Sequence, residues 1–457
     1  MIRTLFICAI MVPGFVAALS SRYAALLLYL WFALFRPQDW LWIDITKLRV
    51  SLVLGLVLIG PALVTGLFPN VTHPLSVGML AFLATTLIAQ VGAIQPATGW
   101  VWIDFLTRLL LACLLLVTLA SESKRLAGVL AVIAGSMGFH AAKAGLAFIL
   151  GGGIRFADGL AGAFFDNNGY ALGTVMIMPL LLATAQNIDV IYSGRFAAWI
   201  ARGFYVSVPL CAFAVIGTYS RGGFLALAAA SIAFVVLQRR RTTAVVALTV
   251  ITAIALAFVP IPHSYVDRLQ TIQTYEQVGD ESAMSRTHFW RVGIRMGLEH
   301  PLGIGVRQYE AAYDRYDTLY GRYGRHRAVH SSHVQVFAEL GFVGLAVWIG
   351  LFVYAFHACL RVRRLSRLDH LDPRLANFLF TAANGLLVSM VAFLVAGAFL
   401  SAALNDVTWL TFAMIAALDR TAATESAATP APAPARRSVP LAFRVVDAYA
   451  PMRGGTA

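Results

Sequence analysis

Long apolar stretches separated by short polar segments make up most of this 457-residue chain. Many stretches have 17 or more residues, enough for an α-helix to cross the hydrocarbon layer of a bilayer. Candidate crossings fall at residues 4–19, 22–36, 49–68, 74–94, 101–120, 126–150, 168–186, 197–219, 221–238, 243–260, 334–357, 376–398 and 402–419. The pattern predicts an all-α, polytopic integral membrane protein.

The composition agrees with this prediction. Hydrophobic residues make up 59% of the chain and charged residues 12%, which is atypical of a soluble globular domain. The net charge of +13 comes mostly from arginine and lies mainly at the ends of apolar stretches, so we expect contact with the bilayer and no nucleic-acid partner. The four cysteines lie in apolar stretches without paired spacing and indicate neither a disulfide nor a metal site.

Two arginine clusters, at residues 239–241 and 361–367, predict the orientation, since both should be cytoplasmic. One crossing, a polar insert at 261–333 and another crossing separate them, so the insert should be extracytoplasmic. The first apolar stretch resembles a signal peptide, but the next follows at once, so we expect it to be retained. Joining these two stretches into one kinked crossing gives about 12 transmembrane helices, with both chain ends inside.

The chain therefore divides into four parts. Residues 1–260 form N-terminal transmembrane helices, 261–333 an extracytoplasmic loop, 334–420 C-terminal transmembrane helices, and 421–457 a Pro/Ala-rich, disordered cytoplasmic tail. Within the loop, residues 284–300 have helical spacing. Residues 308–327 carry a tyrosine every three or four positions, which predicts an amphipathic surface helix whose tyrosines mainly pack.

The polar insert concentrates the side chains able to do chemistry. It contains six of the ten histidines, nine arginines and eight acidic residues. Arg291 and Arg295 are four residues apart on one helical face, and Arg286 is nearby. Cations on one face repel unless an anion lies between them, and the two phosphates of a lipid diphosphate would meet that need. A solvated basic face is the alternative.

Arg221 lies just upstream, in a Ser-Arg-Gly-Gly segment between two predicted crossings. Its glycines could let backbone amides approach an anion at the start of the next helix. The arginine could equally reach from a simple turn to the membrane interface. The residues alone leave both possibilities open.

His330, with Ser331 and His333 beside it, leads directly into a crossing. An imidazole there can exchange a proton with a hydroxyl substrate near neutral pH. His330 and His333 could form half of a metal site, but no third ligand lies at a recognisable distance, so none is expected. Residues 166–168 (Asp-Asn-Asn) could contact sugar hydroxyls or cap the following helix, and we favour the cap.

In order and spacing, these motifs resemble the O-antigen ligase family, which includes O-antigen polymerases and bacterial O-oligosaccharyltransferases. The resemblance covers roughly residues 164–406 and rests on Ser-Arg-Gly at 220–222, Arg-x-x-x-Trp-Arg at 286–291, His-Pro-Leu-Gly-Ile-Gly at 300–305, His-Ser-x-x-x-Gln at 330–335 and Glu-Leu-Gly-Phe-Val-Gly at 339–344. Two positions depart from the family pattern: members often have Asn in place of Ser331 and commonly an aromatic residue in place of His333. The Arg-Pro-Gln-Asp motif at 36–39 is similar to one in members linked to exopolysaccharide clusters.

The resemblance implies glycan transfer from an undecaprenyl-diphosphate carrier to a hydroxyl of lipid A-core, another glycan or a protein. The reaction would take place at the periplasmic face of a bacterial inner membrane, without a metal or other cofactor. Arg221 and Arg286 would bind the diphosphate, with Arg291 and Arg295 as further candidates. His330 would be the base or orient the acceptor, and Ser331 and His333 would lie beside it.

Two alternatives remain. A polymerase would use a second lipid-linked glycan as acceptor. A polysaccharide or lipid transporter is the alternative of another class. Charged residues in mid-crossing and internal repeats, which are typical of transporters, are few or absent in this sequence.

Overall fold

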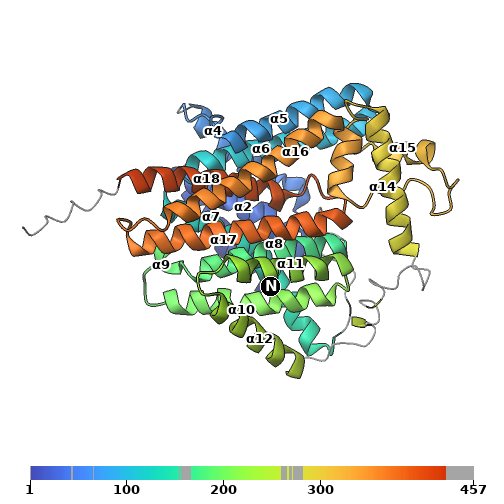
Figure 1. Ribbon diagram of the computed structural model, residues 1–457. Coiled ribbons are helices and arrows are strands. Elements are labelled where there is room, and N and C mark those ends of the chain that lie inside the picture. Colours follow the sequence, from blue (N-terminus) through green and yellow to red (C-terminus); the bar gives the residue numbers. More distant parts are fainter. Residues whose placement is uncertain are drawn as a thin grey trace, which may run out of the picture.

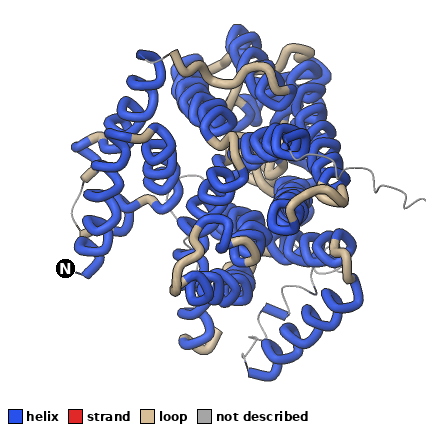
Figure 2. The backbone as a smooth tube through the Cα atoms, turned by 90° about the vertical axis from the view of Figure 1, so that its left-hand side faces the viewer, coloured by secondary structure: helices blue, strands red, loops and turns tan. Residues whose placement is uncertain are grey.

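A computed structural model describes residues 2–42, 45–64, 66–153, 155, 166–258, 265–266, 270 and 281–428. Every regular element in these ranges is a helix, which confirms the all-α class (Figures 1 and 2). The elements are α1 (Ile2–Ser20), α2 (Arg22–Phe35), α3 (Pro37–Trp40), η1 (Thr46–Leu48), α4 (Val50–Val64), α5 (Pro74–Ala89), η2 (Gln90–Gly92), α6 (Pro96–Leu119), α7 (Ser123–Leu150), α8 (Asn167–Ala185), α9 (Ile188–Ile191), α10 (Ala197–Gly217), α11 (Arg221–Leu237), α12 (Arg241–Phe258), α14 (Glu281–Glu299), α15 (Tyr309–Tyr316), α16 (Ser332–Leu365), α17 (Pro373–Ala396), η4 (Gly397–Phe399) and α18 (Asp406–Ala428).

Eight helical segments in the described ranges are long and apolar enough to cross a membrane, which supports a polytopic membrane protein. They are α1, α5 with η2, α6, α7, α8, α10, α16, and α17 with η4. Helices α2, α4, α11 and α12 have shorter apolar stretches of 10–17 residues. The expected total of twelve crossings is therefore not confirmed.

Helices α1 and α2 are separate, whereas the sequence suggested one kinked crossing. Ser21 ends the connection as the N-cap of α2, where its side chain accepts a hydrogen bond from the Ala24 amide. A Cβ added to Gly14 would lie 2.9 Å from Leu28 Cδ1. Gly14 and Leu28 are equally far along the chain from Ser21, so α1 folds back along α2.

The core lies around α8, α17 and α18. Within their apolar windows 83% of α8 and 78% of α17 is buried, against 11% of α1, which places α1 at the periphery. Helix α18 is buried continuously from Val407 to Asp419 and continues to Ala428. Residues 421–428, expected to belong to a disordered tail, are therefore helical; there Glu425 accepts a hydrogen bond from the Ser123 amide (2.8 Å). Residues 429–457 lie outside the described ranges.

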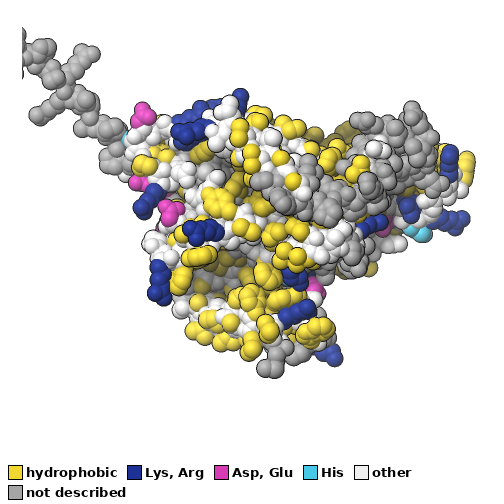
Figure 3. Space-filling model, turned by 90° about the horizontal axis from the view of Figure 1, so that it is seen from below, with side chains coloured by type: hydrophobic (Ala, Val, Ile, Leu, Met, Phe, Trp, Pro, Cys, Tyr) yellow, Lys and Arg dark blue, Asp and Glu magenta, His cyan; other side chains and the backbone are white. Residues whose placement is uncertain are grey.

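The two arginine clusters meet at one end of the bundle. Arg239 donates a hydrogen bond to the Ser366 carbonyl (3.3 Å) and Arg363 donates one to the Leu237 carbonyl (2.7 Å). Helix α11 has 17 residues from Arg221 to Leu237, so these two residues lie roughly 24 Å apart along its axis at the helical rise. Figure 3 shows hydrophobic side chains over much of the middle of one face, with Lys and Arg gathering toward its two ends.

Helix α14 is fixed to α16 by a turn that fits into a kink. Gly341 interrupts α16 with φ 67° and ψ −161°. The Phe342 amide donates a hydrogen bond to the Pro301 carbonyl (3.0 Å), and the Gly305 amide donates one to the Glu339 carbonyl (3.0 Å). A Cβ at Gly341 would overlap that Pro301 carbonyl. Two motifs from the sequence, at 300–305 and 339–344, are thus the two halves of one packing unit.

The second helix of the polar insert is shorter than predicted. The tyrosine pattern predicted a helix over 308–327, but α15 ends at Tyr316, because the Asp317 carboxylate accepts hydrogen bonds from the Leu319 and Gly321 amides and stabilises a turn. Tyr309 is 1% exposed and packs into the insert, whereas Tyr320, beyond the helix, is 97% exposed.

Replacing Gly341 with alanine should destabilise the protein by about 2 kcal/mol, because an L-residue is strained at this φ and its Cβ would overlap Pro301. Gly350, in the same helix, has nothing within 4 Å of its Cβ position. Gly350→Ala should therefore be neutral or stabilising by up to about 1 kcal/mol. Unfolding of both variants in the same detergent measures the difference; equal midpoints would contradict the packing described here.

Candidate active site

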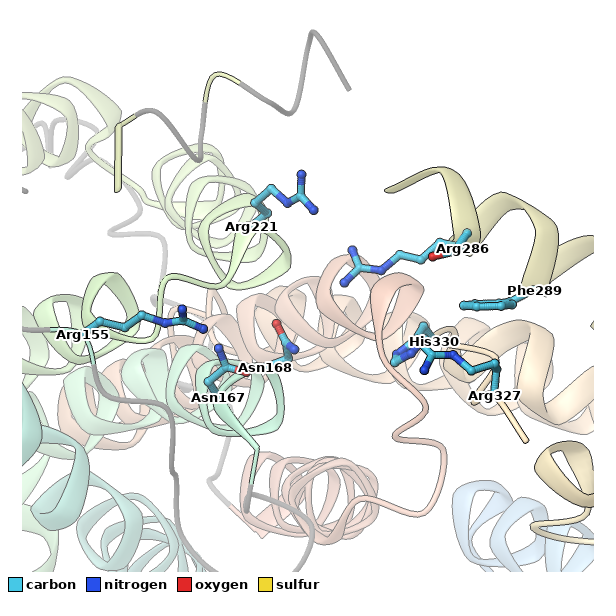
Figure 4. Close-up of a pocket in the computed structure, with 9 residues that line it drawn as sticks. Arg155, Asn167, Asn168, Arg221, Arg286, Phe289, Arg327 and His330 are labelled. Atoms are coloured by element: carbon cyan, nitrogen blue, oxygen red, sulfur yellow. The ribbon is translucent and has the colours of Figure 1, made fainter. Parts of the chain in front are cut away.

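A cavity of about 250 Å³ lies at the end of the bundle opposite the arginine clusters (Figure 4). It is formed where α8, α11 and α14 begin and where the chain enters α16. Its lining residues are Arg155, Asn167, Asn168, Arg221, Ser285, Arg286, Phe289, Arg327 and His330. Arg221, Arg286 and His330, predicted from three separate motifs, therefore share one pocket.

The first turns of α8 and α11 are bound to each other on one side of this pocket. Ser220 caps α11 by accepting a hydrogen bond from the Gly223 amide (3.0 Å), and its hydroxyl donates one to Asn168 Oδ1 (2.7 Å). Asn167 Nδ2 donates a second hydrogen bond, to the Thr218 carbonyl (2.9 Å). Both helices thus place the positive ends of their dipoles beside the pocket, where an anion is favoured.

The sequence prediction that residues 166–168 begin with a helix cap is confirmed. Asp166 Oδ1 accepts hydrogen bonds from the Asn168 and Gly169 amides, at 2.8 and 3.0 Å. The cap also turns the side chains of Asn167 and Asn168 toward α11. These residues therefore serve the helix start and line the pocket at the same time.

The two glycines after Arg221 permit close packing. A Cβ at Gly223 would lie 2.6 Å from Ala171 Cβ, and one at Gly222 would lie 3.3 Å from Phe399 Cβ. The Gly223 amide already donates to Ser220, so it belongs to the helix cap. Positive charge at this corner comes from the Arg221 side chain and from the helix ends.

Helix α14 supplies the opposite wall. Figure 4 shows Arg286 extending from this helix toward Arg221, with His330 and Arg327 below it. Phe289, one turn later, is buried, and its carbonyl accepts a hydrogen bond from Tyr309 Oη (2.7 Å). The Arg286 backbone is therefore held on a packed helix, which sets the direction of the guanidinium.

His330 has a left-handed backbone conformation, with φ 51°. This conformation is uncommon for a residue with a side chain and persists where neighbours enforce it. The His330 amide donates to Ser401 Oγ (3.0 Å), and its carbonyl accepts from Trp290 Nε1 (3.3 Å). Ser331 then caps α16 by accepting a hydrogen bond from the Val334 amide (3.4 Å). The imidazole is thus aimed into the pocket by contacts from α14, α16 and the segment after η4.

The electrostatics of the pocket keep His330 neutral. Burial first, and then the charges of Arg286 and Arg327, together lower the pKa of this imidazole to about 4, while Asp166 acts in the opposite direction. The ring is therefore able to accept a proton at neutral pH. Four guanidinium groups line the same pocket. An anion bound there would offset their charge and raise the pKa of His330.

Four other residues predicted to bind substrate lie outside this pocket. Arg291 and Arg295 line a separate hollow on another face of α14. Ser331 is engaged as a cap, and His333 lies inside the bundle, where its Nε2 is 3.2 Å from the Leu394 carbonyl and its Nδ1 accepts a hydrogen bond from Trp348 Nε1 (3.2 Å). His330 and His333 therefore have different surroundings. Within the described ranges, no three His, Cys, Asp or Glu side chains form a group that could hold a metal ion.

Sequence reasoning did not assign Arg155, Arg327 or Ser401 to the site. Arg327 lies three residues before His330, the only signal that could have identified it. Arg155 lines the pocket and Ser401 accepts a hydrogen bond from the His330 amide, and both lie far in sequence from Arg286 and His330. No spacing rule predicts such contacts.

Comparison with known proteins identifies the domain that contains these residues. Residues 206–349 match the family model described as O-Antigen ligase, and this stretch includes Arg221, Arg286 and His330. The chain contains an O-antigen ligase domain. This supports its assignment to the O-antigen ligase and polymerase family, as the motifs predicted, and makes an enzyme the better interpretation than the transporter alternative.

Two further matches lie outside that domain or are short. Residues 2–189 match a family of unknown function (DUF5935). Protoheme IX farnesyltransferase of Desulforudis audaxviator is 41% identical over 46 residues, which cover 10% of this chain and 14% of that protein. So short a match says nothing about the activity of the whole chain.

Arg286→Gln should raise the pKa of His330 from about 4 toward its ordinary value of 6.5, because a cation that disfavours the imidazolium is removed. The histidine titration can be followed by NMR in the detergent-solubilised protein, with His330→Gln identifying the signal. Arg325→Gln, an exposed arginine of the same loop that does not line the pocket, should leave the pKa unchanged. A His330 pKa near 6.5 in the wild type would contradict this electrostatic account.

Proposed function

We propose that this membrane enzyme transfers a glycan from undecaprenyl diphosphate to an acceptor hydroxyl, with inversion at the anomeric carbon. The observation that carries the proposal is the convergence of Arg221, Arg286 and His330 on one pocket. The O-antigen ligase domain supports the reaction class. The donor, the acceptor and the roles of the residues are our proposal.

The arginines act on the leaving group. As the bond between the sugar and the phosphate breaks, negative charge develops on the diphosphate. Arg221 and Arg286 reach this group from opposite walls, and guanidinium groups can bind phosphate through two parallel hydrogen bonds. The first turns of α8 and α11 add partial positive charge. Such fixed positive charge stabilises the transition state because it needs no rearrangement as the bond breaks.

His330 acts on the acceptor. A ring nitrogen takes the hydroxyl proton while the acceptor oxygen attacks the anomeric carbon, and the electron pair of the breaking C–O bond leaves with the diphosphate. The imidazolium then returns its proton to solvent. A pKa of about 4 makes the histidine a weak base before the donor binds. A bound diphosphate offsets the arginine charges and raises this pKa, so base strength depends on donor binding.

The proposed placement is the periplasmic face of a bacterial inner membrane. The contacts of Arg239 and Arg363 put both basic clusters at one end, which the positive-inside rule assigns to the cytoplasm. Helix α11 spans the distance from that end to Arg221. A donor anchored in the outer leaflet would therefore present its diphosphate at the level of the pocket.

In a transfer assay with a labelled undecaprenyl-diphosphate glycan, His330→Ala should lower kcat by about 10²- to 10⁴-fold, the usual contribution of a general base. His326→Ala is the matched control, because this histidine is four residues away and its side chain is 71% exposed. Lipid A-core and a second lipid-linked glycan should be offered separately as acceptors. Product with the first indicates a ligase, and product with the second a polymerase.

Arg286→Lys in the same assay should retain the positive charge but lose the bidentate hydrogen bonds to the phosphate. We therefore expect an activity between those of the wild type and Arg286→Gln. A correctly inserted His330→Ala protein that turns over at the wild-type rate would refute the proposed chemistry.

A further inference from the structure

Helix α14 separates the pocket from a second, larger hollow of about 760 Å³, which we call the outer groove. Its lining residues are Met284, Thr287, His288, Arg291, Val292, Arg295, Tyr316, Thr318, Leu319 and Tyr323. Met284 faces the outer groove, whereas the next two residues of the helix, Ser285 and Arg286, face the pocket. The two hollows therefore approach each other at the first turns of α14.

The outer groove carries positive charge on one wall. Arg291 and Arg295 are exposed and one helical turn apart, so both can contact one ligand. Arg295 is also paired with Glu299 (2.7 Å), and its guanidinium lies 5.9 Å from the Tyr316 ring. Between residues 281 and 333 there are eight arginines and five acidic residues, so the surroundings have an excess of positive charge.

The other wall is aromatic and held in place. Asp317 accepts hydrogen bonds from the Leu319 and Gly321 amides and lies 2.7 Å from His288 Nε2, which ties the turn after α15 to α14. Tyr316 Oη is 2.7 Å from His300 Nε2. The Tyr316 and Tyr323 rings thus face the groove from a wall that is formed before any ligand binds, which lowers the entropic cost of binding.

Aromatic faces, hydroxyls and two guanidinium groups in one groove fit a sugar that bears a carboxylate or phosphate. The volume lies within the range of about 300–1,000 Å³ typical of small-molecule sites and is about three times that of the pocket. We propose that the outer groove binds an acidic saccharide unit of the donor or acceptor glycan. This inference rests on the proposed function, since the pocket proposed to hold the diphosphate and the outer groove are lined by two faces of the same helix, α14.

A binding experiment with the full chain in nanodiscs tests this directly. The probes are a hexasaccharide with glucuronic acid at every second position and the same hexasaccharide after reduction of its carboxyl groups. The wild type should bind the acidic probe more tightly, with an affinity that falls as salt rises. Arg291→Gln combined with Arg295→Gln should weaken binding of the acidic probe about tenfold or more and leave the reduced probe unchanged.

Arg325→Gln, on the same loop but outside both hollows, is the matched control and should bind like the wild type. Tyr316→Ala should weaken the binding of both probes, because stacking of a sugar on the tyrosine ring does not depend on the carboxylates. Equal affinity of the wild type for the two probes, or no effect of the double substitution, would overturn the inference and identify a solvated basic face.

Two arms keep this result separate from the proposed chemistry. His330→Ala should bind the acidic probe normally while losing transfer activity. Binding without transfer therefore supports both saccharide binding by the outer groove and the catalytic role of His330. Transfer assays that pair an acidic donor with a neutral acceptor, and the reverse, show which glycan occupies the groove: the double arginine variant should raise KM only for the acidic partner. An unchanged KM for both acidic partners would contradict the inference even if His330 proves essential.

Discussion

Positive charge held in a small hollow is the constraint on which the rest of this structure depends. Four guanidinium groups and the first turns of two helices lie around a space of about 250 Å³, and like charges at such distances repel. A stiff framework positions the backbone of these residues before a ligand arrives. Burial and the same positive charge keep His330 neutral, so one pocket holds both the site for a leaving diphosphate and the imidazole that receives a proton.

The framework consists of three connections between segments far apart in sequence. The Asn168–Ser220 hydrogen bond joins α8 to α11 and so places Arg221. The turn at 300–305 fits the α16 kink at Gly341 and fixes α14 with Arg286. Trp290 and Ser401 hold His330 in its left-handed conformation. The short sequence motifs thus contain two kinds of residue: some face the pocket, and others hold its walls together.

Local signals in the sequence predicted the helices well. Apolar runs located most of them, helical spacing at 284–300 predicted α14 closely, and the order of motifs selected three residues that share the pocket. Predictions failed where long-range contacts decide the outcome. The Asp317 turn ends α15 early, the pairing of Gly14 with Leu28 separates α1 from α2, and packing of Glu425 near Ser123 extends α18. Arg291 and Arg295 were correctly placed on one face of a helix, but spacing could not show that this face looks away from His330.

The central claim is that a diphosphate occupies the space between Arg221 and Arg286, beside His330. A cryo-EM structure of the protein with undecaprenyl diphosphate, which lacks a sugar to transfer, tests it most directly. The account predicts phosphate density in contact with both guanidinium groups and next to the imidazole, with the isoprenoid chain leading to the bilayer. Phosphate density against the outer groove, or at the Arg239 and Arg363 end of the bundle, with this pocket empty, would contradict it.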